Sequence, residues 1–243
     1  MINFKSFGFL ELICAGGTAA TASPCSFGVS SFSTTLMQSS EEIFVGSSPT
    51  PRFLKMKKVI IVHGSPSKEE YAIANPPNKS HWIPWLKENL EKEKIKVEIP
   101  LMPECWNPIY DNWKKEFEKI GVDENSILVG HSAGGGFLVR WLGETGKKIK
   151  KLILVAPAIS NKKEDDWENQ ELYNFKINKE ILKNVGEILI YVSDDDDNSI
   201  LESVKVFSKE LGVVPKQFHG YGHFCKGDMG TEKFPELLEE ILK

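Results

Sequence analysis

Arginine is scarce in this chain of 243 residues, because Arg52 and Arg140 are the only two among 30 lysines and arginines. Guanidinium groups are the side chains that proteins favour for binding phosphates and nucleic acids. The formal net charge of −4 adds no general attraction to nucleic acids or anionic membranes. We therefore expect a protein that binds neither nucleic acid nor a membrane.

Cysteine and long apolar stretches are also rare. The four cysteines form no C-x-x-C pair and no zinc-binding spacing, and only Cys105 and Cys225 lie beyond residue 55. This usage suits free thiols in a reducing compartment, so we predict a cytoplasmic protein. The alternative is secretion with a signal peptide in residues 5–22, but Glu11 interrupts its apolar stretch. No apolar run approaches the ~18–20 residues of a membrane-spanning helix.

Composition divides the chain near residue 55. Residues 1–55 are rich in Ser, Thr, Gly and Ala and show no persistent helical or strand period, which predicts a low-complexity, disordered extension. A targeting segment, or translation from a later start, would fit the same composition. Residues 56–243 are charged and strongly patterned, and their length suits one α/β domain.

Apolar strands and amphipathic helices alternate through the patterned region. Strands are predicted at 59–62, 96–99, 126–129, 152–155, 188–192 and 213–218, and helices at 81–94, 110–120, 135–142, 199–211 and 234–242. This alternation predicts a mostly parallel sheet with helices on both faces, with reactive groups at the carboxyl ends of the strands. The polar insert over 158–176 is a candidate for a small lid.

The stretch Gly130-His131-Ser132-Ala133-Gly134 fits G-x-S-x-G between a predicted strand and a predicted helix. Such a turn holds its serine in a strained conformation with the hydroxyl exposed, which makes Ser132 the candidate nucleophile. The N–H of Ala133 then points to where an oxyanion would form. The alternative is a glycine-rich turn with an idle serine.

A serine nucleophile needs a base, and the base needs a carboxylate to orient it. His223 follows the last predicted strand in a loop, so we favour it over His219, which lies in or near that strand. Four aspartates, 194–197, follow the fifth strand, and counting from its end selects Asp196, with Asp197 as the alternative. The chain order Ser, Asp, His is that of an α/β-hydrolase. A solvated acidic loop or a calcium loop would also explain the aspartates, although the glycine and distal glutamate of an EF-hand are absent.

Two further segments are candidates for substrate contacts. Gly64 and Ser65 follow the first strand, where Gly64 allows close backbone approach and the Ser65 N–H is a candidate second oxyanion donor. Trp106 lies on a predicted loop and either lines a substrate pocket or packs against the core.

Residues 57–243 resemble the small serine hydrolases typified by retinoblastoma-binding protein 9. The matching stretches include VIIVHG (59–64), ILVGHSAGGGFLVRWL (127–142), VSDDDD (192–197) and GYGHFCKGDMG (220–230). The resemblance implies a compact α/β-hydrolase fold with little or no cap, and it puts Ser132, Asp196 and His223 at the triad positions. We expect the enzyme to use no metal and no cofactor. It also implies cleavage of small acyl esters or amide-like bonds through an acyl-enzyme, as in a carboxylesterase. The loop over 65–80 is longer than in compact members of that family.

The competing hypothesis is a catalytically silent α/β-hydrolase-fold module that binds another protein. The presence of all three triad residue types argues against it, since a degenerate copy usually loses one of them. The L-x-C-x-E motif typical of retinoblastoma-protein binding is absent, so the sequence names no protein partner.

Overall fold

The computed structural model describes residues 57–73, 75–159 and 170–243. The predicted extension over 1–55 and most of the predicted lid over 158–176 lie outside these ranges. Within the described ranges, the helices are all too short or too polar to cross a bilayer.

In the part of the chain that the structure describes, six parallel strands form one sheet in the order β2-β1-β3-β4-β5-β6. This confirms the predicted α/β-hydrolase type of fold, and every predicted strand is present. Only β6 is markedly shorter than expected, covering three residues. The strands are β1 (Lys58–Val62), β2 (Lys96–Glu98), β3 (Ser126–His131), β4 (Ile149–Val155), β5 (Val185–Ser193) and β6 (Lys216–Phe218).

The longer helices coincide with the predicted ones. The short ones were not predicted, because three to six residues hold too few turns for a hydrophobic period to be recognised. The helices are α1 (Lys68–Ile73), η1 (Pro77–Lys79, a 3₁₀ turn), α2 (Ile83–Lys92), α3 (Tyr110–Phe117), α4 (Ala133–Thr145), α5 (Gln170–Tyr173), α6 (Ile181–Asn184), α7 (Asn198–Leu211), α8 (Lys226–Met229) and α9 (Pro235–Leu242).

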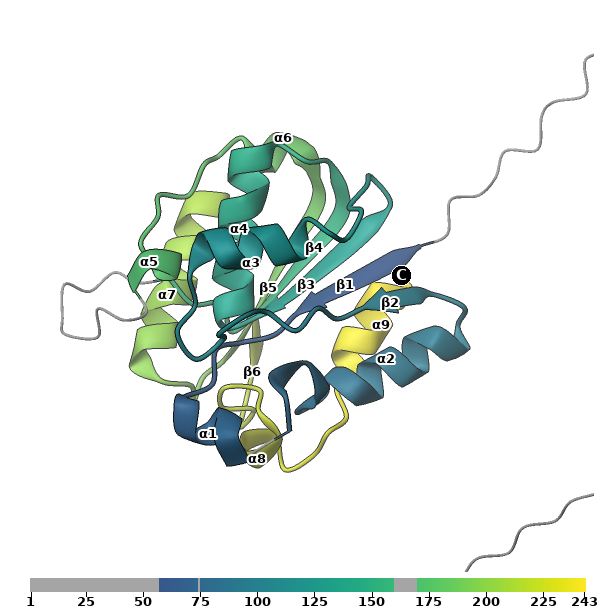
Figure 1. Ribbon diagram of the computed structural model, residues 1–243, viewed down its shortest axis with the longest axis vertical. Helices are drawn as coiled ribbons and strands as arrows, with labels where there is room; N and C mark the ends of the chain where they lie inside the picture. The colour runs from purple at the N-terminus through teal and green to yellow at the C-terminus, as the bar shows by residue number, and fades with distance from the viewer. Residues whose placement is uncertain (1–56, 74, 160–169) are drawn as a thin grey trace, which may run out of the picture. The chain divides into compact units, whose positions relative to one another are not determined.

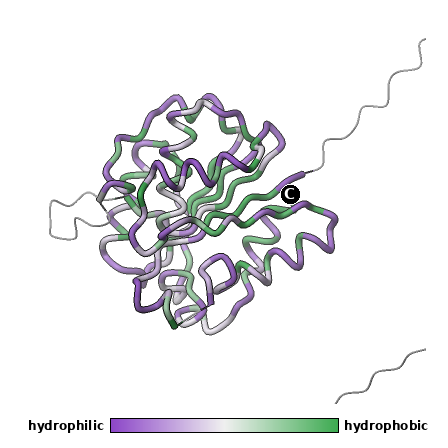
Figure 2. Tube along the Cα trace, viewed as in Figure 1, coloured by the Kyte–Doolittle hydropathy of each residue, from purple (hydrophilic) through white to green (hydrophobic). Residues whose placement is uncertain are grey.

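Helices cover both faces of the sheet, as Figure 1 shows, with α3, α4 and α7 on one face and α2 and α9 on the other. Successive strand residues alternate between two buried clusters: in β1, Ile60 and Val62 join the α3/α4/α7 cluster, while Val59 and Ile61 join the α2/α9 cluster. The strands are therefore apolar on both faces, which Figure 2 shows as continuous hydrophobic segments in the middle of the molecule.

The chain changes direction across the sheet between β1 and β3. From β1 it moves to β2 at one edge, and from β3 it moves through β4 and β5 to β6 at the other edge. Parallel α/β sheets open a crevice at such a switch point, outside the carboxyl ends of the strands. Here those ends lead into Gly64-Ser65 after β1 and Ser132 after β3.

Candidate active site

Ser132 occupies a sharp turn between β3 and α4, residues 130–134, which we call the elbow. Its backbone dihedral angles are φ 52° and ψ −119°, a conformation that costs a non-glycine residue free energy. A Cβ at Gly130 would lie 2.6 Å from the Cα of Gly135, and one at Gly134 would lie 2.3 Å from the carbonyl oxygen of Val62. Glycine is therefore required on both sides of the serine, because the obstructing atoms belong to the backbone.

The turn that follows β1, Gly64-Ser65, approaches the same serine and is called the β1 turn below. A Cβ at Gly64 would lie 3.1 Å from the Cβ of Ser132, which places this backbone directly against the candidate nucleophile. The Ser65 hydroxyl donates a hydrogen bond to the carbonyl of Cys105 and so ties the turn to the loop after β2. Ala133 is buried at the first position of α4, whose N-terminus favours negative charge.

His63 fixes the conformation of the β1 turn. Its Nε2 accepts a hydrogen bond from the Met102 N–H at 3.0 Å, so the ring proton is on Nδ1, which donates to the Gly64 carbonyl at 2.7 Å. Burial lowers the pKa of His63 to about 4, and the ring is therefore neutral at pH 7. His63 has a structural role that the sequence analysis did not assign.

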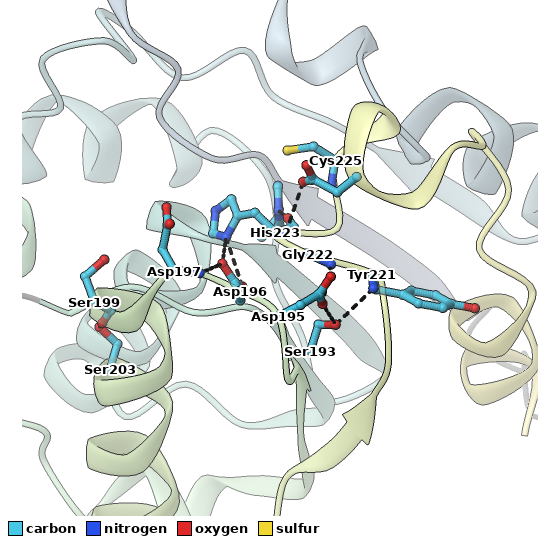
Figure 3. Close-up of polar contacts among 12 residues, drawn as sticks. Ser193, Asp195, Asp196, Asp197, Ser199, Ser203, Tyr221, Gly222, His223 and Cys225 are labelled. Carbon is cyan, nitrogen blue, oxygen red and sulfur yellow. Dashed lines mark hydrogen bonds and ion pairs between the residues drawn. The ribbon is translucent and has the colours of Figure 1, made fainter.

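Asp196 and His223 form a hydrogen-bonded pair (Figure 3). The Nδ1 of His223 lies 3.1 Å from Oδ1 and 3.2 Å from Oδ2 of Asp196, whose side chain is only 1% exposed. The backbone N–H of Asp197 donates to Asp196 Oδ1 at 2.7 Å. Asp197 itself is exposed and immediately precedes α7, so it does not occupy the place beside the imidazole.

The first two aspartates of the run have other partners. Asp194 contacts the exposed ring of His219, with 2.5 Å between Oδ2 and Nδ1. Asp195 accepts hydrogen bonds from the Ser193 hydroxyl at 2.5 Å and the Gly222 N–H at 2.9 Å, and these bonds lower the pKa of its carboxyl group. Asp195 therefore holds the backbone of the loop that carries His223, while His219 is directed to the surface.

Further hydrogen bonds hold the His223 loop. The Nε2–H of His131, in the elbow itself, donates to the His223 carbonyl at 2.8 Å, and Asp228 accepts from the His223 N–H at 3.1 Å. The Nδ1 of His81 accepts from the Lys226 N–H at 3.1 Å. Burial, together with the neighbouring His223, holds the pKa of His131 well below its usual range, so this ring is neutral. No signal in the sequence points to these roles beyond the position of His131 directly before Ser132.

A cavity of about 300 Å³ opens at this point. Ser132 and His223 both line it, together with Gly64 and Ser65 from the β1 turn. Trp106 does not line it, and instead packs behind Tyr71, which does. The other lining residues are His63, Pro66, Glu70, Asn75, Pro77, Ser80, His81, His131 and Cys225.

Cys225 is a second nucleophilic residue type in this cavity. Burial and the carboxylate of Asp228 raise the pKa of its thiol to about 12. Because the thiolate is the reactive form of cysteine, Cys225 is a poor nucleophile at neutral pH. Ser132 is therefore the better candidate nucleophile of the two.

The parallel sheet, the strained serine after β3 and the acid–histidine pair after β5 and β6 together define an α/β hydrolase. The fold is shared with the ydeN gene product of B. subtilis, at a TM-score of 0.67 and 22% identity over 77% of this chain and 97% of that one. Est1E from Butyrivibrio proteoclasticus, solved with ferulic acid bound, gives a TM-score of 0.54 and 16% identity over 77% of this chain and 87% of that one.

The particular family follows from the sequence. The profile of the serine hydrolase family matches residues 73–242, and the chain belongs to that family. YdeN of Bacillus subtilis (strain 168) is 24% identical over 192 residues, covering 76% of this chain and 94% of the relative. Ser132, Asp196 and His223 all lie inside the family match, whereas Gly64 and Ser65 precede it. The narrower resemblance to the retinoblastoma-binding protein 9 branch stays a prediction.

Proposed function

We propose that this serine hydrolase is a carboxylesterase-like enzyme that cleaves small acyl esters, or amide-like bonds, through an acyl-enzyme on Ser132. His223 takes the proton of the Ser132 hydroxyl as the oxygen attacks the substrate carbonyl. Asp196 keeps the ring proton on Nδ1, so that Nε2 is free to act as the base. The backbone N–H groups of Ala133 and Ser65 stabilise the oxyanion.

The second half of the reaction uses the same groups. His223 donates its acquired proton to the leaving group, and the acyl group stays on Ser132. A water molecule then loses a proton to His223 as it attacks the acyl carbon. This releases the carboxylic acid product and restores the serine hydroxyl.

One observation carries the proposal. Ser132 is held at φ 52° in the wall of a cavity that it shares with His223, whose Nδ1 lies 3.1 Å from the buried Asp196 carboxylate. A strained backbone at a cavity and a buried acid–imidazole pair are each costly arrangements, and both serve nucleophilic catalysis.

The cavity and the relatives support small acyl substrates. Its volume of about 300 Å³ is at the lower end of the roughly 300–1,000 Å³ typical of ligand pockets. Est1E, which shares the fold, was solved with ferulic acid, a small carboxylic acid. The resemblance to the retinoblastoma-binding protein 9 branch points the same way, since its members are compact hydrolases.

Labelling and turnover together test the proposal. Wild-type protein should react with a fluorophosphonate probe and hydrolyse p-nitrophenyl acetate, and Ser132→Ala should lose both. Ser199→Ala is the matched control, because Ser199 is exposed on α7 and does not line the cavity. Labelling that persists in Ser132→Ala would remove this serine as the nucleophile. A wild-type protein without turnover would favour the silent binding module.

A further inference from the structure

One segment provides most of the cavity lining. Residues 65–81, between β1 and α2, contribute more lining residues than all other parts of the described chain together. Within this segment, α1 is attached loosely, since none of its residues is fully buried. Its N-terminus is closed locally, as the Glu70 N–H donates to the Ser67 hydroxyl and the Ser67 N–H donates to the Glu70 carboxylate.

Tyr71 joins α1 to the body of the protein. Its side chain is half-buried, packs against the α3/α4/α7 cluster and lines the cavity. The ring centroids of Tyr71 and Trp106 are 4.5 Å apart with 52° between their planes. Such aromatic pairs contribute more than their buried area alone. Tyr71 is therefore both an anchor of α1 and a surface that a substrate would touch.

The loop behind Tyr71 is firmly held. Trp106 follows Cys105, which is fully buried and whose carbonyl accepts the hydrogen bond from the Ser65 hydroxyl. In the same loop, the Pro103 carbonyl accepts a hydrogen bond from Trp113 Nε1 at 3.0 Å. The ring of Tyr71 thus rests on a fixed support, and its position sets the extent of the cavity on this side.

The order of the strands indicates which part of a substrate lies there. The loops after β1 and β2 carry Tyr71 and Trp106, on one side of β3, while Asp196 and His223 follow β5 and β6 on the other side. In the proposed reaction the leaving group takes a proton from His223, so it departs on that side. The acyl group then extends in the opposite direction, toward Tyr71.

We propose that Tyr71 determines the specificity of this site by closing the acyl end of the cavity and restricting it to short-chain acyl groups. The inference rests on the proposed function, because it assigns the cavity a role in binding the acyl part of an ester. Trp106 acts indirectly, by holding the Tyr71 ring in place.

A chain-length series tests the inference, using p-nitrophenyl esters from acetate to decanoate with Ser132→Ala turnover subtracted. For the wild type, kcat/KM should fall beyond a short acyl chain. Tyr71→Ala should raise the octanoate-to-acetate ratio of kcat/KM by about ten-fold or more, as expected for methylenes gaining room in a pocket. Tyr71→Trp should lower that ratio, and Tyr71→Phe should leave it unchanged. Lys68→Ala, an exposed change on the same helix, is the matched control.

The opposite effects expected of the Ala and Trp variants exclude a general loss of structure, which would lower all rates together. A chain-length profile that keeps its shape in both variants would overturn the role of Tyr71 while leaving the esterase proposal intact. Acetate esters of alcohols of increasing size give a second check, because they vary the leaving group and keep the acyl group constant. If Tyr71→Ala changed only that series, the acyl assignment would be wrong. Absence of any Ser132-dependent turnover would overturn the proposed function and this inference with it.

Discussion

Replacing Asp196 by asparagine should lower kcat by about 10⁴-fold, the effect known for a triad whose acid is made neutral. The structure explains why the amide cannot substitute. The Asp197 N–H donates to Asp196 Oδ1 at 2.7 Å, so an asparagine would keep its carbonyl oxygen there and turn its NH₂ group toward His223 Nδ1. An NH₂ group facing Nδ1 requires a bare nitrogen, and the ring proton therefore moves to Nε2. The imidazole can then no longer accept the serine proton.

A factor of 10⁴ corresponds to about 5.4 kcal/mol of activation free energy, at 1.36 kcal/mol for each factor of ten. The assay is kcat for p-nitrophenyl acetate, with thermal unfolding followed by circular dichroism to show that the variant is folded. Labelling of Ser132 by a fluorophosphonate should slow in parallel, because it depends on the same proton transfer.

Asp197→Asn is the matched control. Asp197 is exposed and immediately precedes α7, a position where asparagine and aspartate are equally favourable, so activity should stay within about two-fold of wild type. Equal and small losses for the two substitutions would refute the assignment of Asp196. A loss confined to Asp197→Asn would show that the register of the aspartate run is one residue off.

Two further predictions concern stability. Gly134→Ala should lower the unfolding free energy measured in urea by about 1–3 kcal/mol, because the added Cβ would lie 2.3 Å from the Val62 carbonyl oxygen. Gly121→Ala is the control, because a Cβ there meets no atom within 4 Å. Equal losses in the two variants would contradict the prediction. The unfolded chain binds a proton to His63 at about pH 6.5, whereas the folded protein does so only near pH 4. The unfolding free energy should therefore fall by about 3 kcal/mol as the pH drops from 6.5 to 4. In His63→Gln it should fall less steeply over the same pH range. Equal slopes of unfolding free energy against pH in the two proteins would contradict this prediction.

The sequence predicted the sheet and the elbow because both depend on local requirements. Strands that are buried on two faces must be apolar at every position, and this pattern is legible in Val59–Val62 and Ile127–Val129. The elbow needs glycine at 130 and 134 because a Cβ at either position would collide with backbone atoms. The glycines of the motif therefore predict the turn itself. The short helices were missed because their formation depends on tertiary contacts rather than on a repeated pattern.

The aspartate run shows where local reasoning ends. Four identical residues offer no difference in type, so only the turn after β5 distinguishes them. The Asp196 N–H donates to the Ser193 carbonyl at 3.4 Å, and this turn brings the Asp196 side chain back over the end of the sheet while Asp194 and Asp195 stay exposed. Similarly, Trp106 was a candidate for a pocket residue, but it contacts Tyr71 from an unpredicted helix, and Tyr71 lines the cavity while Trp106 does not.

The two sides of the cavity differ in how firmly they are held, and this difference has a functional consequence. The groups proposed for the chemistry are fixed by hydrogen bonds to the backbone of the His223 loop, from His131 at the end of β3 and from Asp195 in the turn after β5. The segment formed by α1, in contrast, has no fully buried residue and is attached to the body of the protein through Tyr71. A change in that segment can therefore alter the size of the cavity without moving the nucleophile or its base. On this reasoning substrate preference should change readily by substitution in α1, whereas substitution of Asp195, which holds the His223 loop without lining the cavity, should reduce turnover of every substrate alike.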